Sequence, residues 1–425
     1  MVSYLIRFPD YFIFGTATSS HQIEGDNKYN DWWDWETRGK FKVRSGKACN
    51  HWELYKNDIE LMAKLGYNAY RFSIEWSRIF PRKDYIDYGA IDRYKEIISL
   101  LQKYNIEPMI TLHHFTNPLW FMKEGGWIKE ENIKYFIRYV DLIVNEIKNV
   151  KYWITFNEPI IYVLQGYILG AWPPGIKNLK VADQVIINLI KAHNEAYNIL
   201  HEHGRVGIAK NLRAFKPSSN KKSDINAYRK IDIAFNWGFL DGLLNGKLRT
   251  LRSTYRVESG ELDFLGINYY SSYVIKHGRS PYKLYIDAKP LDTGLWTTMG
   301  YCIYPKGLYE VMKNAYEKYH KEIFITENGV AVKDDELRIL SIVRHLQYVY
   351  RALQENIDVK GYFYWSFMDN FEWDKGFEQR FGLVEIDYNT FERKPRKSAY
   401  VYSEIASTKS ISDELLQKYG LDKID

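Results

Sequence analysis

Eight short apolar runs alternate with longer helical patterns along this chain of 425 residues. Between the runs, apolar residues recur every three or four positions, as they do on the buried face of an amphipathic helix. The runs predicted as strands are residues 12–17, 68–74, 107–112, 152–156, 206–210, 263–267, 323–325 and 359–364. Strands that alternate with helices favour an α/β fold with a parallel sheet, and eight such units favour a single (β/α)8 TIM barrel spanning residues 1–425.

A doubly wound open sheet is the alternative fold for this pattern. Such a sheet would usually carry a glycine-rich phosphate-binding loop after an early strand, and no such loop is visible in the sequence. The length alone would suggest two or three domains, but α/β barrels run long as single domains. The chain also has no Pro/Ser/Gly-rich linker and no internal repeat, so the barrel is favoured.

Individual helices can be placed from the same patterns. Asn50 to Glu53 has the form of a capping box, so a helix is predicted to begin there and to end before Gly66. A second helix is predicted from the spacing of Ile91, Tyr94, Ile98 and Leu101. Residues 412–419 form a short amphipathic helix candidate, which we expect to dock on the body of the protein.

Charge and hydropathy argue against nucleic acid and membrane spans. The net charge of +6 comes from 59 basic and 53 acidic residues. The densest basic segments, 247–256 and 393–397, contain no base-reading motif, so no nucleic-acid partner is expected. The longest uncharged run, 159–176, contains three prolines and Gln165 and is interpreted as part of the barrel. No transmembrane span is predicted.

The two cysteines, Cys49 and Cys302, form no metal or redox motif and no disulfide framework. Such sparse cysteine use favours a reducing compartment. The N-terminal segment, MVSYLIRFPD, is too short and too soon charged for a secretory signal. A cytoplasmic location is therefore expected. The oligomeric state cannot be read from the sequence, which is compatible with a homo-oligomer.

Polar side chains follow nearly every predicted strand at its carboxyl end. Because the carboxyl ends of barrel strands meet at one mouth, we expect these side chains to share one surface, where barrel enzymes carry out catalysis. Arg71 is placed at the end of the second strand. The set comprises Gln22, Arg71, His113, His114, Asn157, Glu158, Asn268, Tyr269, Tyr270, Glu327, Asn328, Trp365, Glu372 and Trp373.

Two glutamates of this set each follow a buried apolar run directly. Glu158 lies in TFNEP (155–159) and Glu327 in ITENG (325–329). Two carboxyl groups at one mouth suit a two-carboxylate hydrolase, in which one carboxyl holds a proton and the other does not. Taken alone, Glu158 before Pro159 could simply open a helix, and the segment after Glu327 could simply be a tight turn. The complete set of strand-end residues favours the catalytic interpretation.

Seven segments, which occur in the family's order, resemble glycoside hydrolase family 1, the retaining β-glycosidases. They are FGTATSSHQIEG (14–25), AYRFSIEWSRIFP (69–81), TLHHFTNPLWF (111–121), TFNEP (155–159), GINYY (266–270), ITENG (325–329) and YWSFMDNFEW (364–373). The resemblance covers nearly the whole chain and is greatest to the shorter, archaeal-type members. It implies hydrolysis of terminal, non-reducing β-D-glucosides, β-galactosides or both through a covalent glycosyl-enzyme, with transglycosylation.

The resemblance also implies residue roles. Glu158 would be the acid/base and Glu327 the nucleophile. Gln22, His114, Asn157 and Glu372 would hold sugar hydroxyls, Asn268 would support the region of the 2-hydroxyl, Trp373 would donate a hydrogen bond, and Trp365 would stack on the ring. Arg71 and Tyr270 would contact Glu327, and both would lower its pKa, whereas burial and the like charge would raise the pKa of Glu158.

The resemblance has rivals and departures. Phospho-β-glycosidases of the family bind a 6-phosphate at positions that align here with Glu372, Gln379 and Phe381, and a carboxylate there would repel phosphate. A catalytically silent sugar-binding homologue is the alternative from another class, but such proteins usually lose a catalytic glutamate. Glu75 stands where a small residue is common, which affects only local packing. His113 and His114 have no carboxylate at ligand spacing, so no metal and no cofactor are expected.

Overall fold

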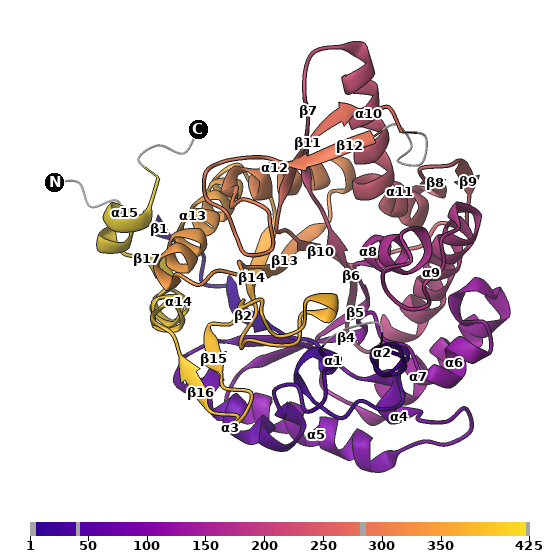
Figure 1. The fold of residues 1–425 in the computed structure, drawn as a ribbon. Coiled ribbons are helices and arrows are strands. Elements are labelled where there is room, and N and C mark those ends of the chain that lie inside the picture. Colours follow the sequence, from indigo (N-terminus) through magenta and orange to yellow (C-terminus); the bar gives the residue numbers. More distant parts are fainter. Residues whose placement is uncertain (1–5, 40–42, 281–285, 422–425) are drawn as a thin grey trace.

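Eight parallel strands close into a barrel in the computed structural model, which describes residues 6–39, 43–280 and 286–421. Going around the barrel, the order is β10, β13, β14, β2, β3, β4, β5, β6, and the view in Figure 1 looks along its axis. The bounds are β2 Ile13–Ala17, β3 Ala69–Ser73, β4 Glu107–His113, β5 Tyr152–Asn157, β6 Arg205–Asn211, β10 Phe264–Asn268, β13 Glu322–Asn328 and β14 Val359–Trp365. The predicted TIM barrel is confirmed.

The predicted strands agree closely with these eight, with one main difference. The apolar run at 323–325 continues as β13 through Thr326, Glu327 and Asn328. This end of β13 departs from regular pairing with β14, where the register shifts between Ile325 and Asn328. Glu327 therefore lies within the strand rather than after it.

Helices cover the outside of the barrel (Figure 1). Following the strands in turn, these are α3 His51–Lys64, α5 Tyr88–Lys103, α7 Ile133–Glu146, α9 Leu179–Leu200, α11 Gly238–Asn245, α12 Pro305–Tyr319, α13 Asp335–Gln354 and α14 Lys397–Thr408. Their apolar stripes pack inward, and in α5 all four residues that predicted the helix are buried.

The predicted start of α3 is correct in position but wrong in mechanism. Asn50 precedes the helix, yet its backbone is left-handed (φ 54°) and its side chain caps no helix N–H. Its backbone N–H donates instead to the carbonyl oxygen of Lys47 at 2.7 Å, so the preceding turn sets the entry to the helix. The C-terminal prediction is confirmed, because Gly66 follows with φ +68°, a conformation that favours glycine.

Shorter elements lie at the carboxyl end of the barrel. They are α1 Ser20–Ile23, α2 Asp31–Thr37, α4 Trp76–Ile79, α6 Leu119–Lys123, α8 Pro159–Val163, a π-helical turn η3 Leu164–Ile168, and a 3-10 turn η6 Trp373–Lys375. Further 3-10 turns are η1 Gly126–Ile128 and η2 Glu130–Asn132.

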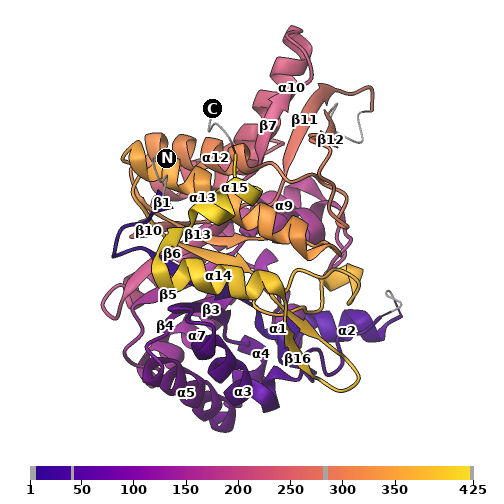
Figure 2. The ribbon, with the colours of Figure 1, turned by 90° about the vertical axis from the view of Figure 1, so that its left-hand side faces the viewer.

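One excursion projects from the barrel after β6 and β10 (Figure 2). Its sheet has the order β12 Ile286–Pro290, β11 Ser272–His277, β7 Ala214–Pro217. Helix α10 Lys222–Asp232 packs on this sheet and continues through a second π-helical turn, η4 Ile233–Trp237, into α11. Two small antiparallel pairs lie outside the barrel sheet: β8 Lys247–Arg249 with β9 Thr254–Arg256, and β15 Val384–Ile386 with β16 Arg393–Pro395.

The two ends of the described chain meet. Strand β1 Ile6–Arg7 pairs antiparallel with β17 Ser410–Ile411. Helix α15 Asp413–Tyr419 then packs on α13, which confirms that this segment docks on the body. No helix among the described residues is long and apolar enough to cross a membrane.

The interior of the barrel is filled by side chains. Tyr152, Phe264 and Phe324 pack edge to face, with ring centroids 5.2 to 5.9 Å apart. All three are buried. The barrel is thus a packed core and not a channel, which leaves the polar cavity to its carboxyl end.

Candidate active site

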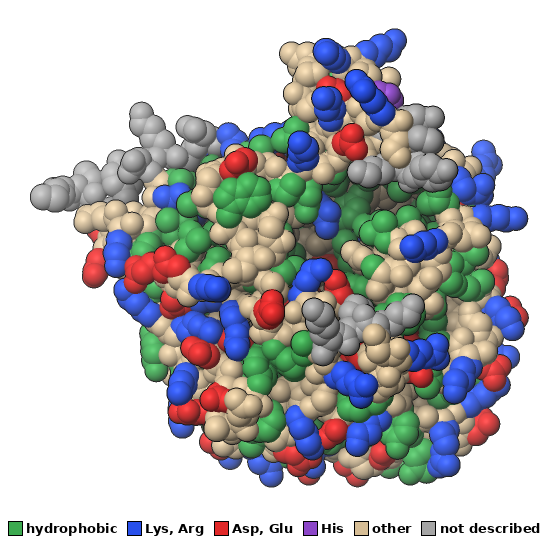
Figure 3. Space-filling view, in the orientation of Figure 1, with side chains coloured by type: hydrophobic (Ala, Val, Ile, Leu, Met, Phe, Trp, Pro, Cys, Tyr) green, Lys and Arg blue, Asp and Glu red, His purple; other side chains and the backbone are tan. Residues whose placement is uncertain are grey.

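A cavity of ≈ 230 Å³ opens at the carboxyl end of the barrel. Figure 3 shows this face of the molecule hollowed near its centre, with hydrophobic and basic side chains around the opening. The cavity is lined by Gln22, His114, Phe115, Asn157, Glu158, Ile161, Gln165, Trp172, Asn211, Arg213, Tyr270, Ser271, Tyr273, Met299, Tyr301, Glu327, Trp365, Glu372, Trp373 and Phe381. Nine of the residues that were predicted to have a catalytic or binding role line this cavity. The other two, Arg71 and Asn268, lie behind its wall.

Glu327 is held by a cation and a phenol. Its Oε1 accepts from Arg71 Nη1 at 2.6 Å, and its Oε2 accepts from the Tyr270 hydroxyl at 2.6 Å. The carboxylate is therefore anchored through both oxygens, and Glu327 still lines the cavity. Charge-assisted bonds of this kind favour the ionised form.

Arg71 is fully buried and lies in the middle of β3, not at its end as predicted. It reaches the site because its long side chain extends along the barrel interior. Its Nε donates to Thr111 Oγ1 at 3.1 Å and its Nη2 to Asn157 Oδ1 at 2.7 Å. One guanidinium thus connects β3, β4, β5 and β13 beneath the cavity floor.

Glu158 has a different set of partners. It directly follows β5 and precedes Pro159, the first residue of α8, in a left-handed backbone conformation (φ 45°). Its side chain does not cap that helix. Its Oε1 accepts from the amides of Asn268 at 2.9 Å and Asn211 at 3.0 Å. Glu158 therefore precedes a helix and also delivers its carboxyl group to the cavity, so a place at the start of a helix is compatible with a place in the cavity.

The strand order brings the two glutamates to one mouth. Strand β5 is separated from β13 by β6 and β10, so the glutamates stand three positions apart around the closed barrel. Asn268, the last residue of β10, lies between them: its Nδ2 donates to Glu158 Oε1 and to Asn157 Oδ1, and its Oδ1 accepts from Thr326. Asn268 therefore links Asn157 and Glu158 at the end of β5 to Thr326, the residue before Glu327.

The orientation of Asn157 fixes the proton on His114. Asn157 Oδ1 already accepts from two donors, Arg71 and Asn268, so its Nδ2 must be the donor on the other side. That Nδ2 lies 3.2 Å from His114 Nε2, which accepts, and the ring proton resides on Nδ1. His114 Nδ1 is buried without a partner among the described residues. Burial lowers the pKa of His114 well below its ordinary value, so the ring is neutral.

Three buried carboxyl groups share the negative charge of the cavity. Burial raises the pKa of Glu327 to about 7, against the charge of Arg71 and the Tyr270 hydrogen bond, while the charge of Glu158 adds to the rise. Arg71 and Tyr270 each lower the pKa of Glu327, as expected, but the loss of water outweighs both, and the net change is a rise. Burial also raises the pKa of Glu158, against hydrogen bonds from Asn268 and Asn211. Because Glu327 alone has a cation and a phenol bonded to it, the charge of this coupled pair resides best on Glu327.

Gln22 and Glu372 lie together on the other side of the cavity. Gln22 is held through Nε2, which donates to Asn370 Oδ1 and the Phe371 carbonyl at 2.9 Å each and approaches Glu372 Oε2 at 3.3 Å. Burial raises the pKa of Glu372 to about 8, with the charge of Glu327 adding. An amide and a carboxyl side by side offer both donors and acceptors to a hydroxyl-rich ligand.

An aromatic wall completes this side. His114 lies nearly parallel to Trp365 and to Trp373, with interplanar angles of 17° and 14°. Trp373 also packs near Trp172 and Trp32, at centroid distances of 5.8 and 4.7 Å. Rigid aromatic faces next to hydroxyl-binding groups suit a ligand that has one apolar and one polar face, as a sugar ring does.

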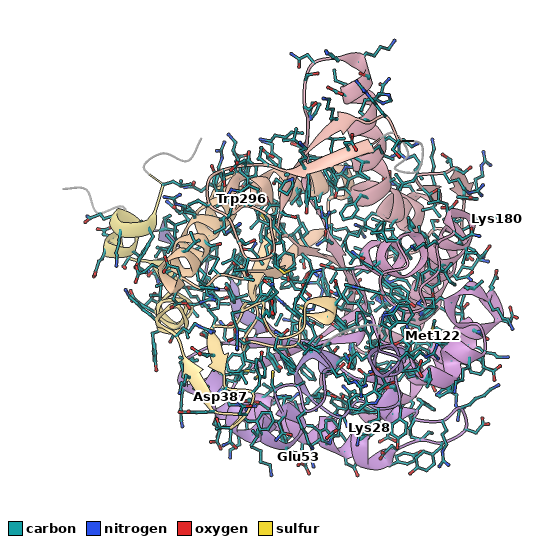
Figure 4. All side chains as sticks on the ribbon, in the orientation of Figure 1. Lys28, Glu53, Met122, Lys180, Trp296 and Asp387 are labelled. Carbon is teal, nitrogen blue, oxygen red and sulfur yellow. The ribbon has the colours of Figure 1, made fainter. Side chains whose placement is uncertain are left out.

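Several residues of the cavity were not predicted from the sequence. Asn211 is the last residue of β6, so its place just after the predicted run 206–210 was the available signal. The segment between β12 and α12 brings Met299 and Tyr301 to the cavity and carries no strand-end signal. Trp296 in the same segment lies at the surface, 48% exposed (Figure 4).

His113 and Glu75 were predicted to have packing roles, and no metal site was expected. His113 lies behind the cavity, where its Nε2 contacts Asn117 Oδ1 at 3.0 Å, consistent with a packing role. Glu75 is fully buried and accepts hydrogen bonds from Ser20, Ser77 and Thr116, so its departure from the family pattern is locally satisfied. Among the described residues, no group of three or more His, Cys, Asp or Glu side chains is arranged to hold a metal ion.

A barrel with this carboxyl pair at its mouth is the architecture of an O-glycosyl hydrolase, and comparison with known proteins agrees. The chain belongs to glycosyl hydrolase family 1, whose model matches residues 4–411. It is similar to the solved structure of a β-glycosidase from Pyrococcus horikoshii, with 52% identity, a TM-score of 0.96 and 99% of each chain covered.

Curated relatives carry more than one activity in their names. A 1,4-β-D-glucan glucohydrolase from Thermotoga neapolitana is 34% identical, covering 96% of this chain and all of the relative. A 6-phospho-β-galactosidase from Clostridium acetobutylicum is 32% identical, covering 96% of this chain and 98% of the relative. The family and the type of enzyme are shown by these matches, and the substrate has to be argued from the cavity.

Proposed function

We propose that this enzyme is a retaining β-glycosidase in which Glu327 is the nucleophile and Glu158 the acid/base. Its substrates are terminal, non-reducing β-D-glucosides, β-D-galactosides or both. One observation carries the assignment of roles: Arg71 and Tyr270 are bonded to Glu327, whereas the Glu158 carboxyl group accepts, among the described residues, only from the neutral amides of Asn211 and Asn268. The anchored carboxylate suits attack, and the neutrally bonded one suits proton transfer.

The first half-reaction uses both groups at once. A carboxylate oxygen of Glu327 attacks the anomeric carbon, and the bond from that carbon to the aglycone oxygen breaks. The proton of Glu158 moves to the departing oxygen, so the aglycone leaves as a neutral alcohol or phenol. The sugar remains as an ester of Glu327.

The second half-reaction follows from the coupling between the two carboxyl groups. The charge of Glu158 raises the pKa of Glu327, and by linkage the charge of Glu327 acts equally on Glu158. Esterification removes that charge, so Glu158 becomes a stronger acid and stays ionised as a base. It then takes a proton from water, or from a second sugar hydroxyl in transglycosylation, and the ester is cleaved.

The glycone is assigned to the side of Gln22, Glu372 and the tryptophans. Asn157 Nδ2 and His114 bond to each other and line the same cavity, and we assign them to the hydroxyls nearest the anomeric carbon. Trp365 supplies a flat face for the sugar ring, and Trp373 an indole N–H. Glucose and galactose differ at one hydroxyl, and an amide with a carboxyl can satisfy either orientation.

A 6-phosphorylated glycone is disfavoured by charge. Glu372 and Phe381 line this side of the cavity, and the described lining residues include a single cation, Arg213, which follows β6 on the opposite side. A phosphate dianion next to Glu372 would meet a carboxyl group and no positive charge. We therefore expect no turnover of aryl β-galactoside 6-phosphate under conditions in which the unphosphorylated galactoside is cleaved.

The test is hydrolysis of paired aryl β- and α-glycosides, with NMR of the first-formed sugar. Cleavage of the β-glucoside or β-galactoside alone, with the β-sugar released first, is the expected result, and the relative rates would rank the glycones. Release of the α-sugar first would mean inversion and would refute the assigned roles. Binding without turnover of any β-glycoside would instead support a sugar-binding homologue.

Anion rescue separates the roles of the two glutamates. In Glu327→Gly, azide can occupy the space of the lost carboxylate and attack the opposite face, giving an α-glycosyl azide. In Glu158→Ala, azide can attack the glycosyl-enzyme and give a β-glycosyl azide. Each variant should lose about 10³-fold or more in kcat on an unactivated glycoside. The reverse pairing of products would exchange the roles.

A further inference from the structure

Arg213 is a guanidinium at the cavity that the glycosidase reaction just described does not use. It lies in the short connection between β6 and β7 and lines the same cavity as Glu158. Its guanidinium carbon is 4.7 Å from the ring centre of Phe235 and 4.9 Å from that of Tyr273. Two aromatic faces therefore hold the cation in a defined place.

The backbone of Arg213 is fixed as firmly as its side chain. Its N–H donates to Asn236 Oδ1 at 3.0 Å, and its carbonyl oxygen accepts from Asn236 Nδ2 at 2.9 Å. Asn236 is buried and is itself bonded to Asp232 at 2.7 Å. One amide thus clamps both polar backbone groups of Arg213, so the residue is built into the cavity rather than left on a loose loop.

The charge of Arg213 is not neutralised by a close partner. Its Nε is buried without a hydrogen-bond partner, and no described carboxylate lies within ion-pair distance of its guanidinium. The neighbouring cation, Lys210, differs in this respect, because its Nζ donates to the carbonyl oxygens of Asn211 at 2.6 Å and Phe235 at 2.7 Å. A guanidinium with free donors at a cavity wall is a ready partner for an oxyanion.

The strand order places Arg213 on the leaving-group side. Strand β6 is four positions from β2 around the closed barrel and so faces it across the mouth. The glycone group at Gln22 follows β2, whereas Glu158, which protonates the leaving oxygen in our proposal, follows β5 beside β6. Tyr273 and Tyr301, which also line the cavity, come from the segments that follow β10 and complete this side.

We propose that Arg213 is a specificity-determining residue that binds an oxyanion, a carboxylate or a phosphate, on the aglycone of the substrate. This inference rests on the proposed β-glycosidase function. It names the substrate class: β-glycosides whose leaving group is an alcohol or phenol that carries a carboxylate or a phosphate. The planar fork of arginine can bind a carboxylate through two parallel hydrogen bonds, and the flanking rings Phe235 and Tyr273 keep the fork facing the cavity.

The test compares leaving groups that differ in charge and little else. The probes are 4-carboxyphenyl β-glucoside, its neutral 4-carbamoylphenyl counterpart, and the 4-phosphonooxyphenyl glucoside, assayed near neutral pH. The native enzyme should favour the carboxylate over the carboxamide in kcat/KM. Arg213→Met, which keeps an apolar stem between the two rings, should reduce that preference about tenfold. Arg213→Lys should fall between the two, since it keeps charge and loses the fork. The phosphorylated probe shows whether phosphate is bound as well as carboxylate.

Lys216→Gln is the matched control. Lys216 lies three residues further along the chain and does not line the cavity. Its replacement by glutamine removes one positive charge, as Arg213→Met does. This variant should keep the native preference. High salt should weaken that preference equally in the native enzyme and in Lys216→Gln, and should have little effect on Arg213→Met. If Arg213→Met lowers kcat/KM equally for charged and neutral probes, or only moves the pH profile, then Arg213 tunes Glu158 and binds no aglycone anion, and the proposal is wrong.

A binding measurement keeps this inference separate from the catalytic one. Calorimetry on Glu327→Gly measures the affinity for the carboxylate and carboxamide glucosides without turnover. Tighter binding of the carboxylate, lost in the double variant Glu327→Gly, Arg213→Met, would support the anion site even if the native protein cleaved neither probe. Equal affinities would refute the anion site even if the native protein cleaved both.

Discussion

Arg71 decides where the charge of the cavity resides. It is the largest of the influences that lower the pKa of Glu327, and the Tyr270 hydrogen bond is a smaller one. Burial nevertheless raises that pKa to about 7. An enzyme that needs Glu327 ionised should therefore lose kcat/KM as the pH falls through about 7, because protonated Glu327 cannot attack. It should also lose activity at high pH, where Glu158 gives up the proton it has to donate.

Arg71→Met tests this account at the level of one residue. Removing the positive charge raises the pKa of Glu327 further, so the acid limb of the kcat/KM profile should move to higher pH. The maximum should fall by about 10² to 10³, the usual cost of losing one electrostatic contact to a reacting group. Tyr270→Phe keeps the ring, removes one hydrogen bond, and should move the limb less.

The pH profiles are measured on a neutral aryl β-glucoside, and circular dichroism checks that each variant is folded. Because Arg71 connects four strands, a loss of activity alone would not separate catalysis from packing. The displaced acid limb is the informative readout. An unchanged limb in Arg71→Met would mean that the Arg71 charge does not set the protonation of Glu327.

At the level of elements, the alternation of apolar runs and helical spacing was enough to predict all eight barrel strands. It worked because a barrel strand is buried on both faces and reads as a short continuous apolar run. The ends were less certain. Glu327 lies inside β13, since the strand continues past its apolar residues into the polar cavity.

The excursion and its contribution to the cavity could not be predicted. Strands β7, β11 and β12 are short, partly exposed and paired between distant segments, so they leave no strong period in the sequence. Tyr301 reaches the cavity only through that tertiary arrangement. Arg213 lies two residues past the end of β6, so its strand-end position was an available signal that was missed. Asn157, Glu158 and Asn268 were predictable because a strand end alone places them at the mouth.

Helix α15 offers a test of how a single element is held. Its apolar side chains Leu415 and Tyr419 are buried against the body, and Arg344 donates to the Tyr419 carbonyl oxygen at 3.0 Å. Leu415→Ala with Tyr419→Ala should lower the free energy of unfolding by about 3–6 kcal/mol, the range for truncating two buried side chains at the edge of a core. The catalytic cavity does not involve this helix, so kcat should be unchanged.

The measurement is the half-life of activity on heating, together with the midpoint of thermal unfolding. Tyr400→Ala, which removes a tyrosine that is 60% exposed on α14, is the control and should change neither. If the double variant kept the native half-life, α15 would contribute no more than an exposed surface residue, and its docking would be incidental to stability.

At the scale of the whole molecule, the dominant feature is that the sheet closes into a barrel. The barrel has no free edge, and β1 with β17 joins the two ends of the described chain outside it. The groups to which we assign catalytic and binding roles come from β3, β5, β10 and β13 and from the segment after β14, so the cavity exists only when strands distant in sequence are together. Stability and activity should therefore share one cooperative unit.

We propose that residues 1–425 unfold as a single domain, the projecting excursion included. The excursion is the weakest candidate for inclusion because α10 and its sheet extend from the body (Figure 2). Its base is nonetheless tied to the cavity, since Asn236 clamps Arg213 and α11 packs on α9. Calorimetry should give one transition, and loss of β-glucosidase activity should coincide with it.

Limited proteolysis on a temperature series shows whether the excursion follows the barrel. Cleavage within α10 should begin only where activity is already falling. Cleavage at lower temperature, with the neutral glucoside still turned over, would show that the excursion opens by itself. In that event the preference for an anionic aglycone should fade before turnover of the neutral probe does, because Arg213 depends on the excursion and the Glu158–Glu327 pair does not.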